Sequence, residues 1–177
     1  MRNRAITGGT MKCYLLPLLI LAICCPAAAH GRGKRGKIIS VLDGDTLKVL
    51  YDGRRQTIRL IGIDAPETRR NRKAYKDSSR GRRDVDTIVM QGKMAKNYVK
   101  TLVKKGDTGR IEFDIEKRDR YRRLLGYVYL PDGRMLNDLI IRNGYASPLT
   151  IPPNVRYWRK FSRSYKYARR HRLGLWK

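Results

Sequence analysis

The residue types best suited to chemistry gather in two short segments, LDGDT at 42–46 and IRLIGIDAPE at 58–67. If Asp52-Gly53 forms a two-residue turn between strands, Asp45 lies opposite Leu60, and Asp64 falls at the same end of the hairpin. Two carboxylates at one strand end, with backbone carbonyls nearby, would form an oxygen-only site. Such a site suits Ca²⁺ or Mg²⁺ better than zinc.

These residues also have a plainer interpretation. Taken alone, DGDT favours an ordinary turn at Asp43 to Asp45, because short motifs recur by chance. Arg59 weighs against it, since a charge in an otherwise apolar strand is costly unless it is paired. Arg59 could pair with Glu67 or wait for a phosphate, which its planar group fits well. Arg123 raises the same question, although a solvated arginine is the default in its basic surroundings.

Other nucleophilic chemistries lack their residues. The only histidines are His30 and His171, and neither is placed for a histidine nucleophile or a Ser/His pair. All three cysteines lie at the N-terminus, at positions 13, 24 and 25. Phosphoryl chemistry would therefore depend on carboxylates, a hard metal ion and arginines.

The N-terminus has the pattern of an export signal. Basic residues precede an apolar stretch from Tyr14 to Cys25, which is too short to span a bilayer, and PAAAH follows it. We expect a signal peptide over 1–29, cleaved after Ala29, a basic linker over 30–36 and one domain over 37–177. The mature protein would be secreted or periplasmic. Met11 is an alternative start, and a lipid-anchored Cys24 or Cys25 is a minor alternative.

The composition predicts a polyanionic partner. The chain has 41 Lys and Arg against 15 Asp and Glu, a net charge of +26, while 41% of its residues are hydrophobic. The chain therefore has enough hydrophobic residues to form a core, and its excess positive charge suits binding to nucleic acid or to an anionic membrane surface.

Hydrophobic patterns predict the elements that must position these residues. Strands are expected over 38–42, 46–51 and 56–63, over the alternating segment RIEFDIEKR at 110–118, and over LLGYVYL at 124–130. We expect a surface loop over 69–85, a helix with its apolar stripe at 94–103, a short helix over 135–143 and a final helix over 155–172. This order predicts an α+β, mainly β fold: a five-stranded OB-fold barrel with about three peripheral helices.

Three motifs in this order resemble the staphylococcal nuclease (thermonuclease) family: DGDT, IRLIGIDAPE and DRYRRLLGYVY. The resemblance runs from about Lys37 to Trp176. It implies an OB-fold, Ca²⁺-dependent hydrolysis of DNA and RNA without sequence preference, and products ending in 3′-phosphate. The protein would act as a monomer with one Ca²⁺ ion and without stable membrane insertion.

The resemblance also implies roles for individual residues. Asp45, Asp64 and the carbonyl of Ala65 would bind Ca²⁺, and Glu67 would position or deprotonate the attacking water. Pro66 fixes φ near −65° and so limits where Glu67 can lie. Contacts to the phosphate would come from the catalytic Arg59 and Arg123, and the substrate-binding residues would be Arg120, Tyr121 and Arg122, with Tyr121 lining the nucleotide pocket.

The sequence departs from the family pattern at several positions. Ala65 replaces the usual threonine, and only its carbonyl is required. Arg122 replaces a glycine, where it could crowd the pocket or add a phosphate contact. SPLTIPPN at 147–154 lacks the tyrosine pair expected to stack on a base, and the basic segment 69–83 is particular to this chain.

The sequence is also compatible with two other functions. A non-catalytic OB-fold module would only bind single strands, but such modules tend to lose the carboxylates and arginines that this chain keeps. A cationic membrane-active protein would use the amphipathic final helix. The apolar stripe of that helix, which includes Trp158 and Phe161, suits packing on a core equally well.

Overall fold

The computed structural model describes residues 33–81 and 84–177, so the predicted signal peptide lies outside the described residues. Within them, five strands form a closed barrel in the order β1-β2-β3-β6-β5. These are β1 (Lys34–Asp43), β2 (Thr46–Tyr51), β3 (Arg54–Leu60), β5 (Thr108–Glu112) and β6 (Leu124–Tyr129). Strands β3 and β6 pair in parallel, and the other neighbours are antiparallel. The predicted five-stranded barrel is confirmed.

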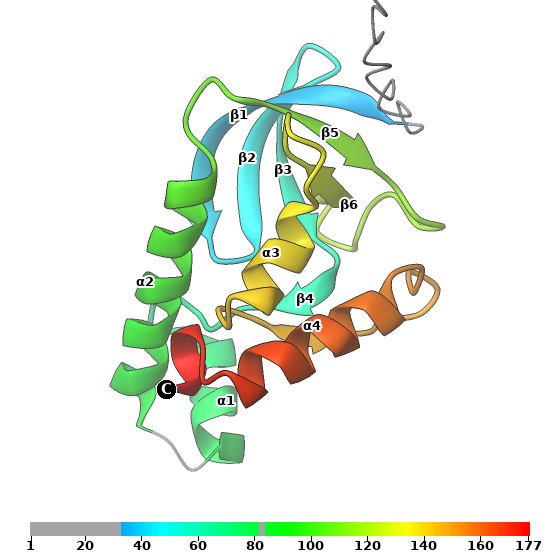
Figure 1. Cartoon of the computed structure of the whole chain (residues 1–177). Helices are drawn as coiled ribbons and strands as arrows, with labels where there is room; N and C mark the ends of the chain where they lie inside the picture. Colours follow the sequence, from blue (N-terminus) through cyan, green and yellow to red (C-terminus); the bar gives the residue numbers. More distant parts are fainter. Residues whose placement is uncertain (1–32, 82–83) are drawn as a thin grey trace, which may run out of the picture.

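Four α-helices surround the barrel in the described part of the chain, one more than predicted: α1 (Arg72–Gly81), α2 (Val85–Leu102), α3 (Leu136–Arg142) and α4 (Trp158–Arg170). A small second sheet pairs β4 (Gly62–Asp64) with β7 (Ser147–Leu149), and a 3₁₀ turn (Gly174–Trp176) follows α4. Figure 1 shows α2 along one side of the barrel and α3 below its open end. No helix of the described residues is long and apolar enough to cross a bilayer.

The hairpin between β2 and β3 has the predicted register. Asp52 and Gly53 have φ of 50° and 70°, the left-handed values of a two-residue hairpin turn. Thr46 pairs with Arg59, and the Leu60 amide donates to the Asp45 carbonyl over 2.9 Å. Alternate residues of β2 are buried, as a strand with one face on the core requires.

The predicted strand over 56–63 is instead two strands. β3 ends at Leu60, and Gly62 has a φ of 80°, so β4 leaves the barrel and pairs with β7. A Cβ added to Gly62 would lie 2.3 Å from the ring of Phe161, so only glycine allows α4 to approach this closely. The break places Asp64 at the end of β4, opposite Ser147 of β7.

Two other predictions of secondary structure were wrong. The segment 69–85 is not a loop, because it contains α1 and the start of α2. The strand predicted within 110–118 ends at Glu112, and Ile115, expected on the buried side, is 70% exposed. Beyond the strand, Asp114 turns inward to pair with Arg156 and with the Tyr127 hydroxyl. Residues 34–36, assigned to the basic linker, form the first part of β1.

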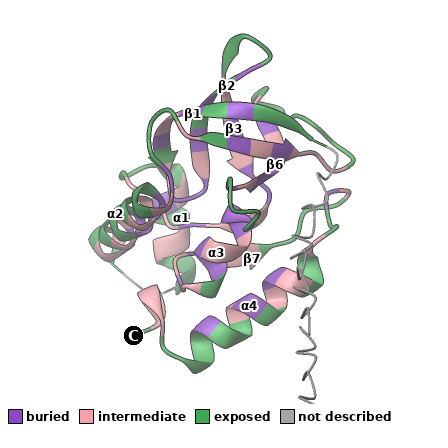
Figure 2. Ribbon diagram, turned by 45° about the horizontal axis from the view of Figure 1, so that its top comes forward, coloured by how far each residue is buried: buried purple, intermediate pink, exposed green. Residues whose placement is uncertain are grey.

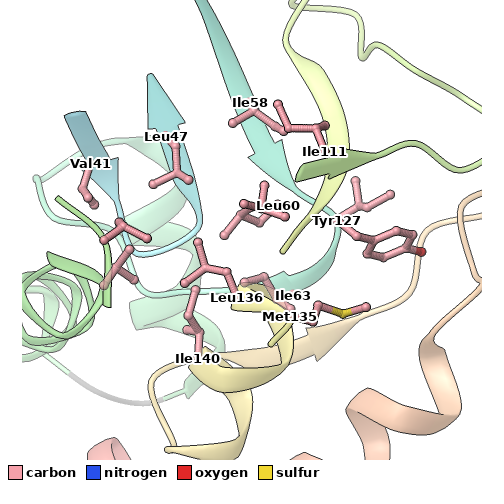
Figure 3. Close-up of a cluster of buried hydrophobic side chains, with 14 of the residues drawn as sticks. Val41, Leu47, Ile58, Leu60, Ile63, Ile111, Tyr127, Met135, Leu136 and Ile140 are labelled. Carbon is pink, nitrogen blue, oxygen red and sulfur yellow. The ribbon is translucent and has the colours of Figure 1, made fainter. Parts of the chain in front are cut away.

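The core fills the barrel and the space between it and α3. Figure 3 shows Leu47, Ile58 and Leu60 from the barrel meeting Leu136 and Ile140 from the helix, and these side chains are fully buried. Figure 2 shows buried residues on the inner faces of the strands and on the sides of α3 and α4 that face them. In α4 the buried residues are Phe161, Ser164 and Ala168, whereas Trp158 is 48% exposed.

Candidate active site

The carboxylates of Asp45 and Asp64 lie close together, because one guanidinium group contacts both. Arg59 Nη1 is 2.6 Å from Asp45 Oδ2, and Arg59 Nη2 is 3.1 Å from Asp64 Oδ1. The Ala65 amide also donates to Asp45 Oδ2 over 2.9 Å. Arg59 therefore pairs with Asp45 and Asp64, and not with Glu67, which was one of the two partners considered for it. Asp45 is only 7% exposed, so these pairs offset the cost of its burial.

Glu67 lies beside this cluster and has partners of its own. Asn71 Nδ2 donates to Glu67 Oε2 over 2.7 Å, and Lys73 Nζ is 3.1 Å from Glu67 Oε1. Helix α2 packs directly on the backbone at this point, since a Cβ added to Gly92 would lie 2.1 Å from the Glu67 carbonyl oxygen. Pro66 and the close approach of α2 together fix the backbone that carries the carboxylate.

Burial shapes the electrostatics of the acidic group. It raises the pKa of Asp64 above its usual value, although the cations of Lys73 and Arg59 act in the opposite direction. It also raises the pKa of Asp43 to about 6, against the lowering effect of a hydrogen bond from the Gly44 amide. The site therefore holds several partly desolvated carboxylates in a protein whose overall charge is strongly positive. Such a group attracts a cation at close range.

Arg123 faces the same space from the other side of the site. It lines a hollow of about 610 Å³ together with Asp45, Arg59, Asp64 and Glu67. Its Nε donates to Asp119 Oδ2 over 2.7 Å, and its backbone amide donates to Asp119 Oδ1. Arg123 is thus fixed by an ion pair rather than solvated. The structure brings together every predicted catalytic residue and both predicted carboxylate ligands.

The predicted substrate-binding residues line two adjacent hollows. Arg120 and Tyr121 border a space of about 810 Å³ that also contains Arg59 and Arg123. The Arg120 guanidinium lies 4.8 Å from the Tyr121 ring centroid and donates to its hydroxyl. The segment 147–154, which lacks the tyrosine pair, contributes Leu149 and Ile151 to this space instead, and both side chains are exposed.

Arg122 does not crowd the active-site hollow. Its φ is 64°, and it lines a separate space of about 380 Å³ with Arg54, Arg55, Arg118 and Arg123. No carboxylate borders this space, which we call the arginine hollow. Arg118 is held in place there by the Gln56 side chain at 2.6 Å and the Arg122 carbonyl at 2.8 Å. Arg123 lines all three spaces, so the arginine hollow adjoins the active-site hollow at this residue.

The donors fit a hard divalent cation in their chemistry. In residues 33–81 and 84–177, no group of three or more His, Cys, Asp or Glu side chains is placed to hold a metal ion. The available donors are two carboxylates, Asp45 and Asp64, and the carbonyl of Ala65. All are oxygen atoms, which Ca²⁺ and Mg²⁺ prefer and which zinc does not.

Sequence reasoning missed three residues that shape the site. Asn71 Oδ1 accepts from the Ala74 amide over 2.9 Å, so it caps α1 while its amide group holds Glu67. Asparagine at a helix start is a recognisable signal that could have revealed this helix. Lys73 and Gly92 carry no such signal, because their contacts arise only in the folded chain.

A closed five-stranded barrel with this strand order and with peripheral helices is an α+β fold of the OB type. The chain belongs to the staphylococcal nuclease family: residues 57–177 match the family described as staphylococcal nuclease homologue. This confirms the resemblance seen in the three motifs.

Three relatives share most of their own length with this chain. It is 31% identical to the thermonuclease of Staphylococcus hyicus over 140 residues, which cover 79% of this chain and 74% of that protein. It is 32% identical to the thermonuclease of Staphylococcus intermedius over 145 residues, with coverages of 82% and 77%. Endonuclease YncB of Bacillus subtilis is 31% identical over 154 residues, with coverages of 83% and 65%.

Proposed function

We propose that this protein is an exported, Ca²⁺-dependent nuclease that hydrolyses DNA and RNA without sequence preference and leaves 3′-phosphate ends. Its thermonuclease and endonuclease relatives make it a hydrolase of the nuclease class, acting on phosphodiester bonds. One observation carries the finer proposal. The hollow lined by Asp45 and Asp64 is also lined by another carboxylate, Glu67, and by two arginines, Arg59 and Arg123.

Each residue has a role that its position supports. Asp45, Asp64 and the Ala65 carbonyl would hold the metal, which when bound neutralises charge on the phosphate. Glu67 takes a proton from the attacking water. The arginines donate hydrogen bonds to phosphate oxygens as negative charge develops there. The oxygen of that water bonds to phosphorus as the bond from phosphorus to the 5′ oxygen breaks. The 5′ oxygen takes up a proton from solvent and leaves as a hydroxyl group, so the phosphate remains on the 3′ end.

The arginine hollow extends the binding surface beyond the reacting phosphate. Its guanidinium groups suit neighbouring phosphates of the same strand, and such contacts position a nucleic acid without reading its sequence. Tyr121, which is 64% exposed, offers a ring face against which a base can stack. Leu149 and Ile151 add apolar contact there and no hydrogen-bonding groups on their side chains.

The first experiment is a cleavage assay with the mature chain from residue 30. Plasmid DNA and RNA are incubated separately with Ca²⁺ and with a chelator, and the product ends are analysed by phosphatase sensitivity. We expect cleavage of both substrates with Ca²⁺ and none with chelator. Tight binding without cleavage in either condition would instead favour the non-catalytic binding module.

A further inference from the structure

The ammonium group of Lys73 lies among the oxygen atoms of the proposed metal site. Its Nζ is 3.3 Å from Asp64 Oδ1, 3.1 Å from Glu67 Oε1 and 3.4 Å from the Ala65 carbonyl oxygen. A fourth oxygen, Oδ2 of Asp77, is 3.3 Å away on the same helix. A compact cation surrounded by carboxylate and carbonyl oxygens resembles the environment that a hard metal ion requires.

This arrangement differs from an ordinary surface ion pair. The Lys73 side chain is 38% exposed, while those of Asp64 and Glu67 are 29% and 20% exposed, so the group is partly removed from solvent. Helix α1, capped by Asn71, carries the ammonium to this position. Two of its four oxygen partners, Asp64 and Ala65, are proposed metal ligands, and a third belongs to the proposed water-activating residue.

We propose that Lys73 is a built-in competitor of the metal ion, which holds Asp64, Ala65 and Glu67 together in the metal-free protein and leaves Asp64 and Ala65 when the ion binds. This inference rests on the proposed function. Two cations repel when they share the same oxygen atoms, and the repulsion is strong where solvent is partly excluded. Asp77 is not a proposed ligand, so it gives the displaced ammonium a partner on its own helix. The competition would keep the site ordered without metal and set the Ca²⁺ concentration that the enzyme needs.

The direct test is calorimetric titration of Ca²⁺ into the mature protein and two variants. Lys73→Met removes the competing charge. Lys76→Met removes the same charge from an exposed position of the same helix. We expect the dissociation constant to fall about tenfold or more for Lys73→Met, since a cation in contact with a carboxylate changes its proton affinity by roughly one to three orders of magnitude. Lys76→Met should stay within about twofold of the wild type, because screening weakens a distant exposed charge.

Thermal melts give a second measure that does not depend on activity. In chelator, Lys73→Met should melt below the wild type, because Asp64, Glu67 and Asp77 lose their shared cation. Saturating Ca²⁺ should close most of this gap, because the ion takes over that role. Lys73→Arg keeps the charge, so its Ca²⁺ affinity should stay near that of the wild type and below that of Lys73→Met.

The outcomes separate this inference from the proposed function. An unchanged or weaker Ca²⁺ affinity in Lys73→Met, with a stability loss equal in chelator and in Ca²⁺, would show a purely structural lysine. If cleavage by the wild type still required Ca²⁺, only the inference would fall. If neither the wild type nor Lys73→Met bound Ca²⁺, the metal assignment and the competition would both be wrong. Ca²⁺ binding by Lys73→Met alone would support the competition in its strongest form.

Discussion

At the level of single residues, the contacts of Glu67 bear most directly on its proposed catalytic role. It is held by Asn71 and Lys73 and makes no ion pair with Arg59, so its charge is not needed to balance the arginine. Two carboxylates, Asp45 and Asp64, already balance that arginine. This division leaves Glu67 available to act on water.

Replacing Glu67 by glutamine tests that role. Glutamine keeps the shape and can still bond to Asn71, but it is not basic. We expect kcat to fall by about 10²–10⁴-fold, the usual range for loss of a general base. Ca²⁺ affinity should change little, whereas Asp45→Asn should weaken Ca²⁺ binding itself. Single-turnover cleavage at saturating Ca²⁺, beside calcium titration, measures both. Near-normal cleavage by Glu67→Gln would return the carboxylate to a structural role.

The two arginines differ in their surroundings, which predicts different consequences for the same substitution. Arg59 is 14% exposed and pairs with two carboxylates, whereas Arg123 is 34% exposed and pairs with Asp119 alone. Lysine cannot reproduce a planar group that contacts two partners. Both Arg59→Lys and Arg123→Lys should therefore cleave more slowly, but only Arg59→Lys should also melt at a clearly lower temperature. An equal loss of melting temperature in both would contradict this assignment.

Among the elements, the hairpin from β2 to β3 was predictable from sequence, and the segments after it were not. Asp52-Gly53 fixes the turn locally, so the register of Asp45 against Leu60 follows from neighbouring residues. The apolar run Leu60 to Ile63 gave no sign of the break at Gly62, because that break depends on Phe161 from the far end of the chain. Helix α1 was missed because it buries only Ala74, so it lacks an apolar stripe.

Buried Asn137 joins the elements around this break. Its Nδ2 donates to the Ile61 carbonyl over 2.9 Å, and its Oδ1 accepts from the Val128 amide over 3.0 Å. Asn137→Ala should destabilise the fold by about 1–3 kcal/mol or more, because buried backbone groups lose their partners. Chemical denaturation measures the loss. Cleavage per folded molecule should change much less than stability, and an unchanged free energy of unfolding would show that water replaces the amide.

The arginine hollow belongs to two elements, the hairpin and the loop before β6. Replacing Arg54 and Arg55 together by glutamine should reduce the salt dependence of duplex DNA binding, since each lost phosphate contact removes roughly 0.9 from the log–log slope. Removing the same charge at Lys104 and Lys105, in the turn after α2, is the control. Binding measured across a salt series with chelator present separates the two. Equal slopes for both double variants would place the phosphates elsewhere.

In the molecule as a whole, basic residues far outnumber acidic ones, and several of the acidic residues gather in two groups. One group of acids lies in the candidate active site. Another, centred on Glu112, ties the barrel to the start of α4: Arg156 Nη1 is 2.7 Å away and the Tyr157 hydroxyl 2.8 Å away. Glu112 lies between the apolar residues Ile111 and Phe113, and this alternation predicts that it faces away from the core, whereas Ile111 is buried. The partners it meets there come from residues 44 and 45 positions later, so the pattern could not reveal them.

This second group predicts a pH dependence of stability. Burial tends to raise the pKa of Glu112, but hydrogen bonds from Arg156, Tyr157 and Arg110 outweigh it, and the pKa lies below its usual value. The folded protein thus binds the Glu112 proton more weakly than the unfolded chain does. The resulting stability is present above the usual glutamate pKa of ~4.3 and is lost as the pH falls through the lowered value.

Glu112→Gln should melt below the wild type at pH 7, and the difference should shrink toward pH 3. The exposed Glu116→Gln provides the control and should follow the wild type across the range. A Glu112→Gln difference that stayed constant from pH 7 to pH 3 would mean that the charge of Glu112 does not stabilise the junction between the barrel and α4.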